Sequence, residues 1–371
     1  MKKAKKHKYK IVVYAIAKDE EQFVDRWMDS MSEADEVVVL DTESSDNTVK
    51  KLKARGAKVY QKSISPWRFD AARNESLKLV PQDADICVCT DLDEVFNKGW
   101  RAILEKAWQP DVKQARYLYN WSLDAQGKPL VWFYYFKIHS RHNFVWQNPV
   151  HEYLKYTGSD YKAIYIDGIV LNHYPDPNKS RSCYLPLLEL AVQENPEDDR
   201  SWYYLGREYL FLGQYDQSIQ TLKKYLSLKS VFAQERCAAM RDIAKCYLKK
   251  SDYLNAYKYY IMAIAHCPYM REAYVELALA AYYNKDYTTV FFMAEQAQNI
   301  KQDSKTYINQ SYAWDSALPD IASVACFELK LYDKAYYYAK QAFGLNPNDT
   351  RIKDNYELIK RHYNKIPYIS N

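Results

Sequence analysis

Asp85-Ile86-Cys87-Val88-Cys89 is a short apolar run, and Thr90-Asp91-Leu92-Asp93-Glu94 follows it directly. The apolar run predicts a buried strand, and an extended continuation would point Asp91 and Asp93 to the same side. Two carboxylates on one side can face one divalent cation and the phosphates that it holds. An isolated Asp-x-Asp is more often an acidic turn that caps the following helix, so the neighbouring segments decide between the two interpretations.

Three segments ahead of this stretch repeat an alternation of strand and helix. Ile11–Ala17 is a continuous apolar run, typical of a buried parallel strand, and an amphipathic helical pattern follows it. Glu36–Leu40 and Lys58–Tyr60 are the next predicted strands, and each is also followed by a helical pattern. Ligands of such a sheet bind beyond the carboxyl ends of its strands, where Asp41 and Asp91 lie. The sequence therefore predicts an α/β fold with a ligand site at this edge.

Four motifs resemble those of the family 2 glycosyltransferases, which have the GT-A fold: Ala17–Glu21, Val39–Thr48, Ala72–Asn74 and Thr90–Glu94. They occur in the order and spacing of the family, within the first half of the chain. The resemblance implies an α/β GT-A domain, a Rossmann-like nucleotide-diphospho-sugar transferase, that binds its donor through Mn²⁺ or Mg²⁺. Asp19 stands where Asn usually precedes Glu20 in the family, which leaves the role of that loop open.

The resemblance also implies which residues form the donor site. Asp41 is similar to the acidic residue of the family that accepts a hydrogen bond from the base or ribose, and a helix cap is its alternative role. Arg73 is a planar cation that can meet the diphosphate or the base, and a surface ion pair with Asp70 or Glu75 is its alternative. The expected nucleotide-sugar-binding residues are Ala15, Ala17, Glu20, Asp41, Arg73 and Asp91.

The metal site is expected to combine two carboxylates with a histidine. Asp93 should reach the metal itself, and Asp91 the metal or the ribose. Oxygen ligands suit Mg²⁺ or Mn²⁺, and either ion would stabilise the departing nucleoside diphosphate as a Lewis acid. His173 ends the strand pattern Ile169–His173 and is the candidate third ligand, with His151 as the alternative.

Glu152 is the candidate general base. Val150-His151-Glu152 resembles a Val-His-Glu segment that recurs in the family, and a carboxylate near the anomeric carbon can deprotonate an acceptor during in-line displacement. Between this segment and the donor motifs, Tyr117–Trp121 and Leu130–Phe136 predict an antiparallel hairpin. The resemblance favours inversion at the anomeric carbon, which the residues alone do not decide.

The second half of the chain has a different periodicity. Tyr215, Tyr253, Tyr287 and Tyr332 each open a similar tetrapeptide, at steps of 38, 34 and 45 residues. These steps resemble the tetratricopeptide repeat, whose period is about 34 residues, with insertions in the first and last intervals. Asn348–Asn364 is expected to be a capping helix. An unrelated helical bundle is the alternative to stacked helical hairpins.

Composition adds a few limits. The expected domains are a basic tail (1–10), a GT-A domain (11–180) and a helical repeat domain (181–371). The tail contains six lysines and predicts a solvated segment or an anchor to an anionic surface, without the apolar core of a signal peptide. No run reaches the ~20 apolar residues of a membrane span, so a cytoplasmic location is expected. The net charge of +5 does not favour nucleic acid as a partner.

The cysteine count indicates reduced thiols. Seven cysteines are an odd number, and the sequence contains no Cys-x-x-Cys pair. Cys87 and Cys89 point to one side of their predicted strand and are expected to pack there rather than to bind a metal.

These features predict a metal-dependent glycosyltransferase that moves a sugar from a nucleotide-sugar donor, with UDP favoured, to a peptide or protein held partly by the repeats. This architecture resembles bacterial enzymes that glycosylate peptides, including the S-glycosyltransferases of glycopeptide bacteriocins. A glycan or lipopolysaccharide-core acceptor is the alternative within the enzyme class. A repeat scaffold with an inactive transferase domain is the alternative from another class, and intact Asp91, Asp93 and His173 argue against it. Glycoside hydrolysis by paired acids would leave the nucleotide-site motifs unexplained.

Overall fold

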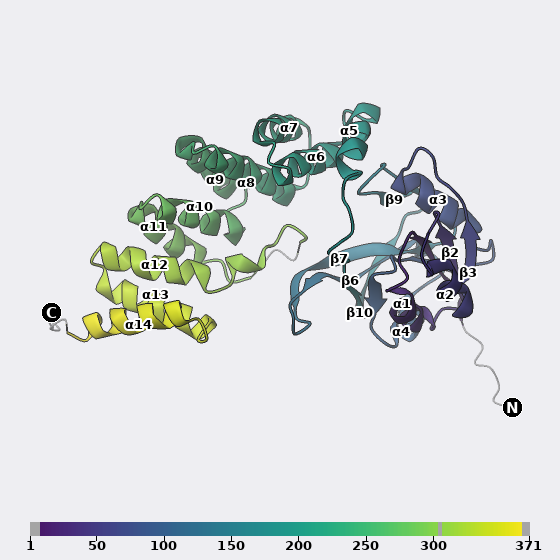
Figure 1. The fold of residues 1–371 in the computed structure, drawn as a ribbon, viewed down its shortest axis with the longest axis horizontal. Coiled ribbons are helices and arrows are strands. Elements are labelled where there is room, and N and C mark those ends of the chain that lie inside the picture. Colours follow the sequence, from purple (N-terminus) through teal and green to yellow (C-terminus); the bar gives the residue numbers. More distant parts are fainter. Residues whose placement is uncertain (1–7, 303–305, 366–371) are drawn as a thin grey trace. The chain divides into compact units, whose positions relative to one another are not determined.

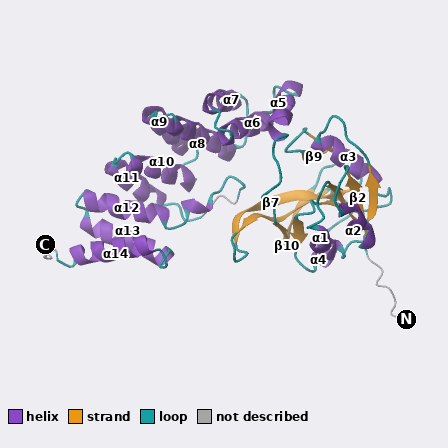
Figure 2. Ribbon diagram, in the orientation of Figure 1, coloured by secondary structure: helices purple, strands orange, loops and turns teal. Residues whose placement is uncertain are grey.

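The computed structural model describes residues 8–302 and 306–365, in two compact units that meet between Pro196 and Glu197 (Figure 1). The strands belong to the first unit, and the second is drawn as helices and loops (Figure 2). Most of the predicted basic tail lies outside the described residues. None of the helices in the described ranges has the length and apolar character that crossing a bilayer requires.

An eight-stranded sheet forms the centre of the first unit, with the order β3-β2-β1-β4-β7-β6-β10-β5. Its strands are β1 (Ile11–Ala17), β2 (Glu36–Asp41), β3 (Lys58–Gln61), β4 (Ile86–Cys89), β5 (Glu94–Phe96), β6 (Gln114–Leu123), β7 (Pro129–Ser140) and β10 (Ala163–His173). A separate pair is formed by β8 (Phe144–Gln147) and β9 (Tyr153–Tyr156). Strands β3, β2, β1 and β4 are parallel, whereas β7 runs antiparallel to β4 and β6. The predicted α/β fold and the β6–β7 hairpin are confirmed.

Helices cover both faces of this sheet. They are α1 (Val24–Met31), α2 (Thr48–Ala54), α3 (Phe69–Leu79) and α4 (Trp100–Ala107), and α5 (Tyr184–Glu194) follows the last strand in the chain. Along β1, Val13 packs in one core with Trp27 of α1, and Tyr14 packs in the other core with Leu77 of α3. Because both faces are buried, the strand is apolar at successive positions.

The cysteines of β4 belong to the α3-side core. Cys87 and Cys89 are fully buried there, so the predicted packing role is confirmed. All seven cysteines are free thiols in the structure.

Helix α5 packs against α3, within the first unit. Arg68 Nη2 donates to Glu194 Oε2 at 3.0 Å, and the rings of Phe69 and Tyr184 meet edge-on with centroids 6.1 Å apart. The sequence assigned this helix to the range 181–371, whereas the first compact unit extends to Pro196.

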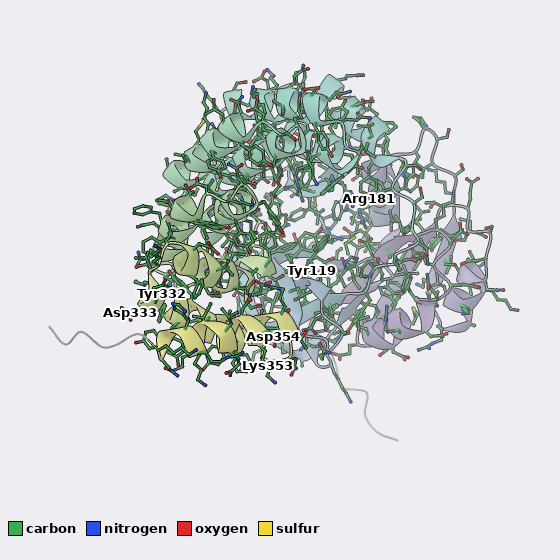
Figure 3. All side chains as sticks on the ribbon, turned by 60° about the vertical axis from the view of Figure 1, so that its left-hand side comes forward. Tyr119, Arg181, Tyr332, Asp333, Lys353 and Asp354 are labelled. Carbon is green, nitrogen blue, oxygen red and sulfur yellow. The ribbon has the colours of Figure 1, made fainter. Side chains whose placement is uncertain are left out.

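The second unit is a stack of helical hairpins. Its helices are α6 (Asp199–Phe211), α7 (Tyr215–Ser227), α8 (Ala233–Lys249), α9 (Tyr253–His266), α10 (Arg271–Tyr283), α11 (Tyr287–Ala297), α12 (Ala317–Glu328), α13 (Tyr332–Leu345) and α14 (Thr350–Tyr363). The four repeated tyrosines are the first residues of α7, α9, α11 and α13, the second helix of each hairpin. Figure 3 labels Tyr332 at the start of α13, and Lys353 on the predicted capping helix α14. The tetratricopeptide-like repeats are confirmed.

The long last step of the repeat is explained by the segment between α11 and α12. This segment contains a short 3₁₀ turn, Ser311–Ala313, which contacts α10 and α12. Ile308 packs into the core formed by α6 to α10, and the hydroxyl of Tyr312 donates to the Glu276 carboxylate. The described part of the insertion around Ile308 and Tyr312 therefore belongs to the packed repeat structure.

Candidate active site

The acidic stretch lies at the carboxyl end of β4 and is a closed turn. Trp27 Nε1 of α1 donates to Thr90 Oγ1 at 3.0 Å, which fixes the start of the turn. The amide of Asp91 donates to Glu94 Oε2 at 2.9 Å, and the amide of Glu94 donates to the Asp91 carbonyl at 3.1 Å. The expected extended continuation through Asp93 is therefore wrong. The chain reverses because Glu94 begins β5, which pairs antiparallel with β10.

The Asp91 carboxylate faces two cations. Arg73 Nη2 of α3 lies 2.8 Å from one oxygen, and Lys137 Nζ of β7 lies 3.0 Å from the other. Lys137 reaches this position because β7 pairs antiparallel with β4. Burial alone would raise the pKa of Asp91, but Arg73 and Lys137 outweigh burial and hold that pKa well below its ordinary value. Asp91 is therefore ionised and has two fixed countercharges.

Arg73 links Asp91 to the candidate base. Its guanidinium is almost fully buried, and its Nε donates to Glu152 Oε1. The alternative partners behave differently, since Asp70 pairs with Arg68 at 2.9 Å and Glu75 pairs with surface lysines. Asp91, a predicted donor-site residue, and the candidate base Glu152 are thus joined through one arginine.

Asp93 lies beside His173. Pairing of β5 with β10 puts Glu94 opposite His173, and the amide of Tyr174 donates to the Asp93 carbonyl at 2.8 Å. The side chains of His173 and Asp93 approach to 3.3 Å between Nε2 and Oδ2. Burial lowers the pKa of His173, but the hydrogen bond and charge of Asp93 outweigh this and raise it. His173 Nδ1 lies 2.9 Å from the carbonyl of Trp121, which holds the ring.

The alternative histidine has another neighbour. His151 contacts the ring of Tyr184 on α5, with centroids 5.7 Å apart. Within the described ranges, no three histidine, cysteine, aspartate or glutamate side chains gather as a metal cluster. Asp93 and His173 form a pair of candidate metal ligands. The carboxylate of Asp91 instead faces Arg73 and Lys137.

Asp41 ends β2 and is sealed from solvent. One of its carboxylate oxygens accepts from the amide of Ser44 at 3.1 Å and from Gln61 Nε2 at 3.4 Å. The other oxygen is buried and has no hydrogen-bond partner in the described part of the protein. A buried carboxylate oxygen without a hydrogen-bond donor costs free energy. This oxygen could accept a hydrogen bond from an N–H or O–H group of a ligand.

The neighbouring β1 positions complete this edge. Ala17 pairs in register with Asp41, and the carbonyl of Ala15 accepts from Ser76 Oγ at 2.8 Å. Asp19, the departure from the family pattern, has a left-handed φ of 54°. Its carboxylate accepts from the amide of Ser45 at 2.7 Å, so it fastens the loop that follows β2.

Glu20 is a buried carboxylate paired with Lys179, which follows β10 in the chain. Burial raises the pKa of Glu20 to about 7, and the opposing charge of Lys179 only partly offsets this. Asp93 and Asp91 also raise that pKa, so Glu20 lies within electrostatic range of the acidic turn.

Sequence reasoning missed three charged residues of this edge. Lys137 is the single charged residue in the aromatic and apolar run Leu130–Ile138, and that was the available signal. Glu94 was part of the acidic motif but had no assigned role, although its side chain closes the turn. Lys179 lies in a Pro-, Asn- and Ser-rich stretch that looked like a linker.

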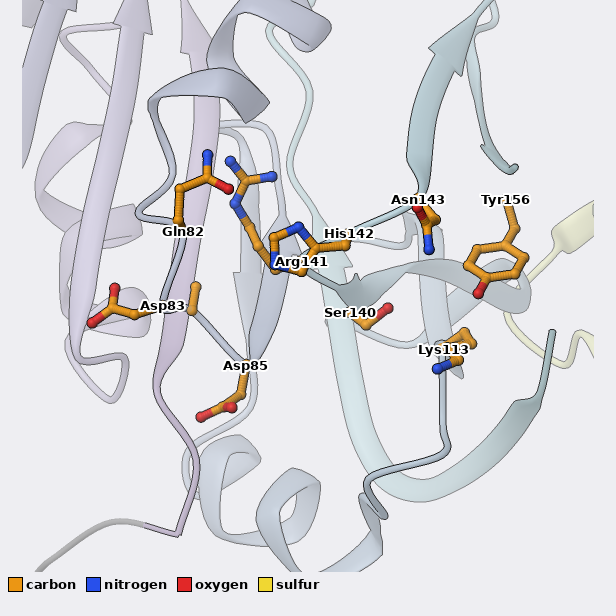
Figure 4. Close-up of a pocket in the computed structure, with 10 residues that line it drawn as sticks. Gln82, Asp83, Asp85, Lys113, Ser140, Arg141, His142, Asn143 and Tyr156 are labelled. Carbon is orange, nitrogen blue, oxygen red and sulfur yellow. The ribbon is translucent and has the colours of Figure 1, made fainter. Parts of the chain in front are cut away.

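A hollow of about 330 Å³ lies elsewhere on the first unit (Figure 4). It is lined by Asp83 and Asp85 before β4, Lys113 before β6, and Arg141 after β7. These residues flank the opposite ends of the strands from the acidic turn, so the hollow is separate from the candidate site.

Comparison with known proteins identifies the first part of the chain. Residues 12–157 match the model of glycosyl transferase family 2, so they form a family 2 domain and the protein is a glycosyltransferase. No curated protein matches the sequence.

Solved structures similar to part of the chain have low identity. MamA is 18% identical over 48% of this chain and 99% of its own, with a TM-score of 0.38. Pseudomonas aeruginosa pilF is 12% identical over 48% of this chain and 72% of its own, with a TM-score of 0.37. A chain of the APC/C hetero-tetramer Cut9-Hcn1 is 18% identical, and the match spans 49% of this chain and 33% of that one, with a TM-score of 0.37.

Proposed function

We propose that the protein transfers a sugar from a UDP-sugar to a peptide or protein acceptor, in a reaction that depends on Mn²⁺ or Mg²⁺ and inverts the anomeric carbon. The observation that carries this proposal is the convergence of Asp41, Asp91 and the Asp93–His173 pair at one sheet edge. The orphan oxygen of Asp41 suits an N–H or O–H donor of the base or ribose.

Asp93 and His173 fit a divalent cation. A carboxylate oxygen and an imidazole nitrogen are acceptable ligands for Mn²⁺ and Mg²⁺, and donor phosphates and water complete such sites. The cation would stabilise the charge of the departing nucleoside diphosphate. In this arrangement Asp91, held by Arg73 and Lys137, orients the ribose or the diphosphate rather than binding the cation alone.

Glu152 is the proposed base. The Arg73 guanidinium keeps its carboxylate in one place. The acceptor hydroxyl or thiol would give its proton to Glu152 as it attacks the anomeric carbon from the face opposite the diphosphate. Arg73 therefore couples the orientation of the base to that of the donor.

The donor proposal is tested by calorimetry with UDP and GDP, each in Mn²⁺ and in EDTA. We expect UDP to bind the wild-type protein in Mn²⁺ and to bind weakly in EDTA, because Asp93 and the diphosphate repel each other without the cation. Asp93→Asn should lose most of this dependence. Equal UDP affinity in Mn²⁺ and EDTA would reject the metal assignment.

The acceptor proposal concerns the second unit. Because the first unit has little structure beyond its sheet and covering helices, we propose that the repeats supply much of the acceptor affinity and also contact protein partners. A fragment of residues 1–196 keeps α5 on its own core. If folded, it should bind donor but lose transfer to the large acceptor. Transfer at the full-length rate would reject this role of the repeats, and a glycan acceptor is the alternative.

A cytoplasmic location is part of the same proposal. The free thiols, including the neighbouring Cys87 and Cys89, suit a reducing compartment.

A further inference from the structure

We propose that Lys179 is a diphosphate-binding residue, which leaves Glu20 and binds the leaving-group phosphate when the donor enters. This inference rests on the proposed function and adds to it a residue from outside the motifs. Lys179 lies on residues 174–183, the connecting segment between β10 and α5.

The connecting segment is attached to the edge that carries the acidic turn. Its first residue, Tyr174, donates its amide to the Asp93 carbonyl at 2.8 Å. Two residues later, Asp176 Oδ2 accepts from Gln22 Nε2 at 2.9 Å. At the other end, the guanidinium of Arg181, labelled in Figure 3, lies 4.6 Å from the ring centroid of Tyr184 on α5. The segment is thus held at both ends, with Lys179 between them.

The ammonium of Lys179 lies among the acids of the site. It forms an ion pair with Glu20, whose side chain is only 9% exposed. Burial lowers the pKa of Lys179, but Glu20 and then Asp91 and Asp93 outweigh it and raise that pKa. Lys179 is therefore within electrostatic range of both carboxylates of the acidic turn. The proposed metal-bound diphosphate would lie at this turn.

Lys179 differs from the other two cations of the edge in its freedom to move. Arg73 and Lys137 are 5% and 6% exposed, and each contacts two carboxylates. Lys179 is 57% exposed, and it forms an ion pair with one carboxylate, that of Glu20. The ammonium lies at the solvent-facing side of this pair, and a lysine has a flexible four-carbon stem. The ammonium can therefore turn from Glu20 to a phosphate without a change in the backbone.

The exchange would serve the chemistry of the leaving group. A diphosphate carries more negative charge than a carboxylate, and a second cation beside the metal stabilises the charge that develops as the sugar bond breaks. Glu20 in turn holds Lys179 at the site before the donor arrives, so the ammonium is already in position.

The test compares UDP with UMP by calorimetry in Mn²⁺, using the full chain. Lys179→Met should weaken UDP binding by about tenfold or more, the usual loss of a charged hydrogen bond, and change UMP binding by less than about twofold. Lys179→Arg should keep most of the UDP affinity. Lys162→Met is the matched control, because Lys162 is 49% exposed and pairs with Asp111 at 2.6 Å, at the strand-start edge.

Each outcome decides the proposal. Equal UDP affinity for Lys179→Met and the wild type would overturn it, as would an equal loss of UDP and UMP, which indicates a structural role. A loss in Lys179→Arg as large as in Lys179→Met would reject the charge argument. If the wild type binds neither UDP nor GDP in Mn²⁺, the proposed function itself fails and this inference fails with it.

Discussion

Replacement of Lys137 by methionine is the most informative perturbation of the first unit. Lys137 Nζ lies 3.0 Å from Asp91 and 3.6 Å from Glu94, and its side chain is 6% exposed. Methionine keeps much of the length but removes the charge. Asp91 retains Arg73, whereas the buried Glu94 loses the cation that opposes its burial.

The Lys137→Met variant should lose the free energy of unfolding that is typical of breaking a buried ion pair. Removal of one partner costs about 3–5 kcal/mol because the other charge stays buried. For a unit of this size, that corresponds to a fall in Tm of roughly 6–20 °C. Burial already raises the pKa of Glu94, and loss of Lys137 raises it further. The carboxyl is then neutral at low pH, so the stability deficit of Lys137→Met should be smaller at pH 5 than at pH 8.

Urea unfolding followed by tryptophan fluorescence measures this loss, since Trp27, Trp100 and Trp146 are buried in the first unit. Combining Lys137→Met with Glu94→Gln should recover about 1–3 kcal/mol, because the two residues are in contact. A loss below about 1 kcal/mol for Lys137→Met at pH 8, or no recovery in the double variant, would refute the reasoning.

Three further predictions address other parts of the chain. Glu152→Gln should keep UDP binding and lower turnover by roughly a hundredfold or more, and unchanged turnover with an inactive His151→Ala would transfer the role of base. For Glu20, the folded state holds the proton more tightly (pKa about 7) than the unfolded chain (4.5), so its contribution to stability falls by about 3 kcal/mol as pH rises between these values. Glu20→Gln should gain stability relative to the wild type over that range in urea unfolding, and a constant difference would contradict this. Gly206→Ala places a Cβ 2.5 Å from the Leu222 side chain, so thermal unfolding of the second unit should show a loss of about 1–3 kcal/mol, and an unchanged Tm would show that Leu222 can move aside.

Local patterns in the sequence were sufficient for most elements of the fold. The apolar run Ile11–Ala17 is β1 from end to end, because a strand buried on both faces leaves a continuous signal. Tyr253 and Tyr287 begin α9 and α11 because each follows an aspartate whose side chain caps the helix. In both cases the signal and the structure involve the same few residues.

The partners of the site residues depend on contacts that local patterns do not contain. Asp91 meets Lys137, 46 residues later, only because β7 pairs antiparallel with β4. Arg73 meets Glu152, 79 residues away. The acidic turn itself follows from β5 pairing with β10, and that register is not written in Asp91 or Asp93. The roles assigned to Glu152, His173 and the donor-site residues stay predictions.

The countercharges of Asp91 and Asp93 have a consequence for how the protein is handled and regulated. Arg73 and Lys137 balance the charge of Asp91, and His173 lies beside Asp93. The two carboxylates therefore have partners in the protein itself and need no metal ion for folding. A metal that is needed to fold a chain is lost together with the fold under chelation, as in zinc fingers. With the proposed metal dependence, chelators should stop transfer and leave this protein folded. The ion would then act as a co-substrate, and the supply of Mn²⁺ or Mg²⁺ would set the rate of transfer without changing how much protein accumulates.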